Sequence, residues 1–308
     1  MTTTTLTAPT PTGRDMLRWH KPLLLLTAAM AVLAVVTTVG IFADPRILTG
    51  VPIWLKPWKF AVSFVLYAFT LAWMISVLPR RSRLAEWAGV VIVGVAMIEM
   101  SIIVLQAARG TTSHYNETTA FNGALWNAMG ASIMVLFVAH LLIGVIALVQ
   151  RIKDRPTRYA ILLGLGISLL GMLAAVPMVM PSDEQVAANI GGAHTVGLPD
   201  GGPGLPVTGW STVGGDLRIG HFVGLHALQA LPLLAFLLRR RFDRTTQARL
   251  LLVAGAAYAV LVMLLTWQAL RAQPLIHPDA LTLAAWTALA VAAAGAAKLV
   301  IRGAGAKA

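Results

Sequence analysis

Eight long apolar runs alternate with short polar segments along the chain. They lie near residues 22–43, 59–78, 86–106, 124–149, 159–180, 219–238, 248–270 and 281–301. A membrane core of about 30 Å needs about 20 helical residues, so each run is long enough to cross it. The runs are continuous rather than alternating, and backbone groups in lipid must bond within the chain, so spanning strands are excluded. The sequence therefore predicts an all-α polytopic bundle of about eight transmembrane helices.

The basic residues give this bundle a direction. Of the 24 Lys and Arg residues, 18 fall in the two tails and in the loops after the second, fourth and sixth runs. Cytoplasmic loops carry such an excess of Lys and Arg. The pattern predicts that both termini are cytoplasmic. It also places the long loop 181–218 on the extracytoplasmic side of a bacterial inner (plasma) membrane.

Three regions follow from this reading. Residues 1–21 are expected to form a disordered cytoplasmic tail, since the first 13 are rich in Thr and Pro and have no apolar periodicity. Residues 22–301 form the eight-helix transmembrane domain, and residues 302–308 a second cytoplasmic tail. The first run is too long for a signal peptide and no cleavage pattern follows it, so it is expected to remain as a helix.

Composition limits the chemistry. The chain is 57% hydrophobic, 12% charged and free of cysteine, which excludes disulfides, Cys-ligated metals and thiol catalysis. A net charge of +12 suggests nucleic acid at first sight. Because the basic residues follow the predicted topology, they are better explained by contact with anionic lipid. The expected partner is the lipid bilayer, no nucleic acid is expected, and a homo-oligomer or a larger membrane complex is left open.

Polar residues gather in the outer half of the predicted bundle. Glu99, about seven residues from the outer end of its run, is the one carboxylate well inside a span, where an ionisable residue is costly. It is therefore the candidate catalytic residue, predicted to carry a proton or to bind a metal, with a structural ion pair to Arg109, Lys56 or Lys59 as the alternative. The other members predicted for this polar layer are Gln106, Arg109, Asn127 and Gln229.

The histidines are the candidate ligands. His221 and His226 lie in the sixth run, about 140° apart on an ideal helix, so they would border one polar face without chelating a single ion. Imidazole is a common ligand of haem iron and of transition metals. His114, His221 and His226 are the predicted metal ligands, and His221, His226 and His140 the predicted cofactor ligands. For His221 and His226, a structural hydrogen bond between helices is the alternative, and for His140 it is a histidine that only packs within the bundle.

Two segments carry a resemblance. The runs Val51–Phe60 and Gly215–His226 resemble those of multi-span bacterial membrane proteins to which no established activity is attached. The resemblance implies the topology only and assigns no functional residue.

Three functions remain open from sequence. The first is a redox or metal protein, with haem b or a transition metal held in the outer half. The second is a proton-coupled transporter or channel for a small solute, and the third a non-catalytic assembly subunit. The sequence does not decide whether the protein is an enzyme.

Overall fold

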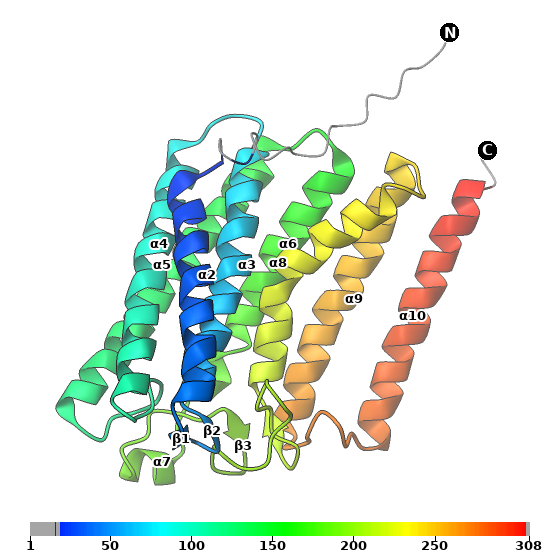
Figure 1. Cartoon of the computed structure of the whole chain (residues 1–308). Helices are drawn as coiled ribbons and strands as arrows, with labels where there is room; N and C mark the ends of the chain where they lie inside the picture. The colour runs from blue at the N-terminus through cyan, green and yellow to red at the C-terminus, as the bar shows by residue number, and fades with distance from the viewer. Residues whose placement is uncertain (1–15, 17–18, 306–308) are drawn as a thin grey trace.

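The computed structural model describes residue 16 and residues 19–305 of the 308-residue chain. Within them, eight helices are long and apolar enough to cross a membrane, which confirms the predicted all-α architecture (Figure 1). They are α2 (Lys21–Ala43), α3 (Leu55–Ser76), α4 (Arg83–Ala108), α5 (Ala120–Gln150), α6 (Arg155–Leu173), α8 (Arg218–Leu238), α9 (Arg244–Leu270) and α10 (Ala280–Gly305). A short 3₁₀ helix, η1 (Val176–Val179), extends the span of α6, and each predicted run agrees with one helix to within a few residues.

Neighbours in the chain are mostly neighbours in space. Helix α2 packs on α3, α4 on α5 and α5 on α6, while α6 packs closely on α8 and both contact α9. Helix α10 stands at one edge of the bundle against α9 (Figure 1). Helix α3 meets α8 over a small area only. The two walls formed by α3–α4 and by α6–α8 are therefore partly separated, and this separation creates the cavity described below.

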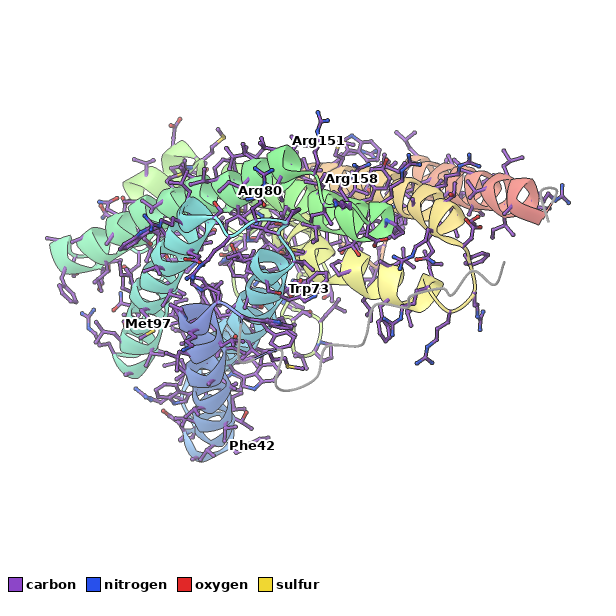
Figure 2. All side chains as sticks on the ribbon, turned by 90° about the horizontal axis from the view of Figure 1, so that it is seen from above. Phe42, Trp73, Arg80, Met97, Arg151 and Arg158 are labelled. Carbon is purple, nitrogen blue, oxygen red and sulfur yellow. The ribbon has the colours of Figure 1, made fainter. Side chains whose placement is uncertain are left out.

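The side chains around the circumference of the bundle, which point away from its centre, are mostly apolar. Phe42 on α2 is 85% exposed and Met97 on α4 is 47% exposed, and Figure 2 shows both side chains at the periphery. Arg80, Arg151 and Arg158, labelled in the same view, lie in or beside the loops at one end of the helices. A soluble protein rarely exposes so much contiguous apolar surface, whereas a lipid-facing bundle must.

The end opposite these arginines carries the small secondary elements (Figure 1). Strands β1 (Ile47–Leu48) and β2 (Val51–Pro52) form a hairpin whose turn residues Thr49 and Gly50 both have positive φ, as a tight two-residue turn requires. Helix α7 (Asp183–Ala187) and the pair β3 (Thr195–Val196) and β4 (Gly215–Asp216) belong to the long loop. These elements fold the loop over the ends of α3 and α8.

The start of α2 differs from the prediction. His20, predicted to lie in a disordered tail, caps the helix: its Nδ1 accepts from Leu23 N at 3.3 Å, and its Nε2 lies 2.9 Å from the carbonyl of Glu86. Trp19 beside it is buried. The rest of the predicted disordered tail, residues 1–15 and 17–18, lies outside the described residues.

Glycine fixes the closest helix contact. A Cβ atom on Gly171 of α6 would lie 2.6 Å from the backbone N of Leu225, and one on Gly224 of α8 would lie 2.4 Å from Cα of Gly171. Only two residues without side chains allow the backbones of α6 and α8 to approach this far. The contact holds the outer half of α8, with its histidines, against α6.

Candidate functional site

A cavity of about 2980 Å³ occupies the half of the described bundle that lies next to the long loop, the half that the predicted topology places outside. Residues of α3, α4, α5, α6 and α8 form its walls, and the hairpin and the long loop form its mouth. Toward the other end, Leu71, Ile92, Ile143 and Leu165 are buried in one packed apolar core and do not line the cavity. The cavity is therefore open toward the loop end and closed toward the end that carries the basic loops.

Glu99 lies in the cavity wall and is 5% exposed. The Ser132 hydroxyl lies 2.5 Å from Oε1 of Glu99 and 3.0 Å from the carbonyl of Met129. A hydroxyl has one proton to donate. An ionised Glu99 accepts this proton, whereas a protonated Glu99 donates to Ser132, which then donates to Met129. Both protonation states of the carboxyl group are thus satisfied in one geometry.

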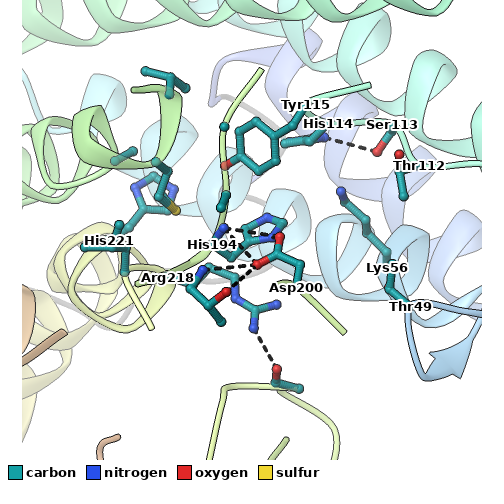
Figure 3. A pocket seen from close by; sticks show the side chains of 18 of the residues that line it. Thr49, Lys56, Thr112, Ser113, His114, Tyr115, His194, Asp200, Arg218 and His221 are labelled. Atoms are coloured by element: carbon teal, nitrogen blue, oxygen red, sulfur yellow. Dashed lines mark hydrogen bonds and ion pairs between the residues drawn. The ribbon is translucent and has the colours of Figure 1, made fainter. Parts of the chain in front are cut away.

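Three cationic side chains line the same cavity. Arg218 is paired with Asp216 at 2.6 Å and also donates to the carbonyl of Gly209. Lys59 donates to the carbonyl of Thr208 at 3.0 Å. The ammonium group of Lys56 has no hydrogen bond or ion pair with any described residue, and Figure 3 shows its side chain pointing into the pocket. Lys56 is thus the cation here that lacks a protein partner.

Helix α8 presents His221, His226 and Gln229 to the cavity, as the sequence predicted for one polar face. The Nδ1 atom of His221 lies 2.8 Å from the carbonyl of Gly171, and Nδ1 of His226 lies 3.3 Å from Oε1 of Gln229. In both rings Nε2 has no partner among the described residues. Asp216 precedes this helix but does not cap it. The cap position is Leu217, and Asp216 instead accepts from the backbone N of Arg218.

His140 lies below the cavity and is fully buried. Its Nδ1 lies 2.9 Å from the Tyr67 hydroxyl, and its Nε2 lies 2.9 Å from the Ser168 hydroxyl and 3.3 Å from the carbonyl of Leu165. The network joins α3, α5 and α6. Because both ring nitrogens are engaged, neither is free to bind iron in this structure, and the structural alternative describes His140 better.

The rest of the predicted polar layer divides into two groups. Arg109 donates to Gln106 at 2.5 Å and to Asn122 at 2.9 Å, which ties the end of α4 to the start of α5 outside the cavity. Glu99 therefore does not pair with Arg109. Asn127 does line the cavity, but no described residue forms a hydrogen bond with its side chain.

Loop side chains cover the mouth (Figure 3). The rings of His114, Tyr115 and Trp126 pack together, with the ring centroids of Tyr115 and Trp126 5.0 Å apart. The ring centroids of Tyr115 and His194 are 4.9 Å apart. Burial lowers the pKa of His114 well below its ordinary value, and the charge of Lys56 adds to this effect. His114 is therefore a neutral imidazole at neutral pH.

Asp200 holds the loop on the mouth. Its carboxylate accepts from the backbone N of both His194 and Thr195, and it lies 2.5 Å from Nδ1 of His194. Burial raises the pKa of Asp200, but the hydrogen bond and the charge of His194 outweigh it, so this pKa is well below normal. Burial lowers the pKa of His194, and Asp200 opposes the shift only in part.

The predicted metal ligands do not converge. Among the described residues, no group of three or more His, Asp or Glu side chains has a geometry that could hold a metal ion. His114, His221 and His226 all line the cavity, but His114 comes from the segment between α4 and α5, whereas His221 and His226 belong to α8. The described histidines therefore do not fit a multi-donor metal site.

Sequence reasoning missed four residues of the cavity. In the sequence, Lys56 stands out only as a possible ion-pair partner of Glu99, and His194, Tyr67 and Asp200 do not stand out. Lys56 lies just before the apolar run that begins near residue 59, a position where a lysine that anchors the helix at the membrane surface and a cavity cation look alike in sequence. The role of Asp200 depends on the fold of the long loop, which hydrophobic patterns do not encode.

Comparison with known proteins gives no relative. No family model, no curated protein and no solved structure matches the chain. The sequence and the structure together establish a multi-span helical membrane protein, and the function rests on the cavity alone.

Proposed function

We propose that this protein is a proton-coupled carrier that takes a small solute into its outer cavity. The observation that supports this most directly is Glu99 with Ser132. A carboxyl group in the wall of a solute-sized space, satisfied both with and without its proton, is what proton coupling requires. The floor beneath it is closed, so the described state is the one open toward the loop end.

The proposed cycle uses two states. In the open state the solute enters from the loop end and Glu99 takes up a proton. The bundle then opens toward the basic loops, the solute leaves and Glu99 releases the proton there. The gap between the α3–α4 and α6–α8 walls gives the two parts room to move, and the small contact of α3 with α8 resists that motion little.

The test is transport into proteoliposomes that carry a pH-sensitive dye inside. A panel of labelled organic anions, amino acids and sugars is offered with a proton gradient. Wild type is expected to take up one class of solute together with protons, and Glu99→Gln to lose proton movement. Glu117→Gln, which changes an exposed loop carboxylate, is the matched control. Equal proton movement in Glu99→Gln and wild type would refute the proposal.

Sidedness is tested separately. A reporter fused after residue 200 is expected to appear outside the cytoplasm, because the basic loops lie at the opposite end of the helices. The long loop would then face the supply of solute. A cytoplasmic signal would reverse the direction of the cycle.

A haem-based redox function is the second candidate. The specific observation in its favour is His221, whose Nδ1 faces the carbonyl of Gly171 and whose Nε2 is left free toward the cavity. Metal-bound imidazoles commonly have such a second bond. Purified protein from haem-replete cells would then show a Soret band that His221→Ala removes. A colourless wild-type protein would eliminate this candidate.

A further inference from the structure

The unpaired cation in the cavity points to the charge of the ligand. Arg218 and Lys59 already have protein acceptors, whereas Lys56 has none among the described residues. An ammonium group away from bulk water is costly unless an anion or several acceptors face it. The hydroxyl group of Thr112 lies on the same lining and can donate a hydrogen bond to an anion there. The mouth is therefore suited to a negatively charged group.

The lining below the mouth is of another kind. It is made mainly of aromatic and aliphatic side chains, namely Phe60, Phe64, Ile103, Met129, Ile133 and Phe137. Glu99 and Gln229 interrupt this surface at single points. A ligand whose anionic group reaches Lys56 would therefore lay an apolar body along these walls. A fully polar solute, such as a sugar, would leave the apolar lining without a partner.

We propose that the ligand of this cavity is an amphipathic organic monoanion, with its anionic group on Lys56 and its apolar body against the α3 and α5 walls. This ligand would be the substrate class of the proposed carrier. The ligand proposal rests on the proposed function only because both concern the same cavity. Binding at equilibrium requires neither proton movement nor passage through the membrane. The two proposals therefore fail in different experiments.

The shared chemistry has two sources, a free amphiphile or the headgroup and chain of an anionic lipid. Octanesulfonate is a suitable probe because it stays ionised at all working pH values. Octanol is its matched neutral partner. Binding of both is measured by calorimetry to the full chain in nanodiscs of phosphatidylcholine. A second set of nanodiscs contains phosphatidylglycerol, which competes with the probe if a lipid headgroup also occupies Lys56.

Wild type is expected to bind octanesulfonate at least tenfold more tightly than octanol. Lys56→Met should abolish this preference, because one charge-assisted contact is worth about tenfold or more. Lys59→Met, whose charge already has a backbone acceptor, should keep most of the preference, and Phe64→Ala should weaken both ligands alike. Glu99→Gln should still bind the anion even if it no longer moves protons.

Several results would overturn the inference. One is equal binding of octanesulfonate and octanol by wild type. Another is an unchanged preference in Lys56→Met that still elutes as folded protein. Loss of octanesulfonate binding in phosphatidylglycerol nanodiscs alone would keep the site and assign it to lipid. Selective binding without any proton movement would leave the inference standing and refute the carrier.

Discussion

Ser132 faces Glu99 across the contact of α4 with α5, with its hydroxyl oxygen 2.5 Å from Oε1 of the carboxyl group. The same hydroxyl lies 3.0 Å from the carbonyl of Met129, so its one proton has two places to go. This relationship distinguishes Glu99 from a carboxylate locked in an ion pair, which would be held in one charge state. A proton can enter or leave Glu99 here without leaving a buried polar atom unsatisfied.

Removing the Ser132 hydroxyl should impair proton exchange. In Ser132→Ala, Glu99 has no hydrogen-bond partner, and a lost bond to a charged group costs about 1.5–3 kcal/mol. We expect solute-driven proton uptake in proteoliposomes to fall about tenfold or more. Ser101→Ala, which changes an exposed serine on α4, is the control. Normal uptake in Ser132→Ala would mean that Glu99 exchanges its proton by another route.

The network around His140 should contribute to stability. Tyr67→Phe removes one hydrogen bond between helices, which is worth about 0.6 kcal/mol on average in membrane proteins. His140→Ala removes the whole network and leaves a void, for which we expect about 3 kcal/mol. Thermal unfolding in detergent at neutral pH measures both changes. If His140→Ala unfolds like wild type but loses a haem spectrum, the ligand role of His140 would be restored.

The contact of Gly171 with Gly224 should not tolerate a methyl group. Gly171→Ala would push the backbone of α8 away, and we expect a loss of about 1–3 kcal/mol in stability together with a displaced His221. Gly166→Ala, on the same helix with open space at its Cβ position, should be neutral or slightly stabilising. Thermal unfolding of the two variants side by side is the measurement. Equal stability would show that α6 and α8 are not as close as described.

The long loop should loosen in mild acid. The pKa of His194 and of His114 is lowered in the folded state, so each contributes stability that is present above about pH 6.5 and is lost as the pH falls toward the folded value. The pKa of Asp200 is lowered too, so its contribution is lost only in stronger acid, below the ordinary carboxyl range.

Hydrogen exchange of residues 181–217 at pH 7.5 and pH 5.5 tests this. After correction for the intrinsic exchange rate, which itself falls with pH, the loop is expected to be less protected at pH 5.5 than at pH 7.5. In Asp200→Asn the loop should exchange quickly at both pH values. The His194 ring and the backbone N–H groups of His194 and Thr195 then lose their charged acceptor. His277→Ala, in an exposed loop of the same side, is the control. A loop equally protected at both pH values would contradict the assignment.

The fold was predictable because lipid imposes one rule along the whole chain. Continuous apolar runs and alternating basic loops are enough to give eight helices and their ends, as α2 and α9 illustrate. Depth was also predictable, since Glu99, His221 and His226 do line one outer cavity. The rotation of each helix about its own axis, which decides what its side chains face, was not predictable. Gln106 and Arg109 share a stripe with Glu99 on an ideal helix, yet they turn to Asn122 at the next helix.

The partners of side chains depend on which helices meet, and no local pattern encodes this. His140 was predicted as a ligand because its depth alone was visible from sequence, whereas Tyr67 and Ser168 come from helices 73 and 28 residues away in the chain. Asp200 acts through a loop whose turns depend on β3 and β4 pairing. Lys56 could be recognised as a cavity cation only once its lack of a partner was known.

The central claim is that Glu99 exchanges a proton while the bundle stays folded. Infrared difference spectroscopy of the purified chain in nanodiscs, titrated across neutral pH, observes the C=O stretch of a protonated carboxyl group directly. Wild type and Glu117→Gln are expected to show one such band that appears and disappears reversibly with pH, and Glu99→Gln is expected to lack it. A band that persists in Glu99→Gln, or no titrating carboxyl band in wild type, would contradict the account.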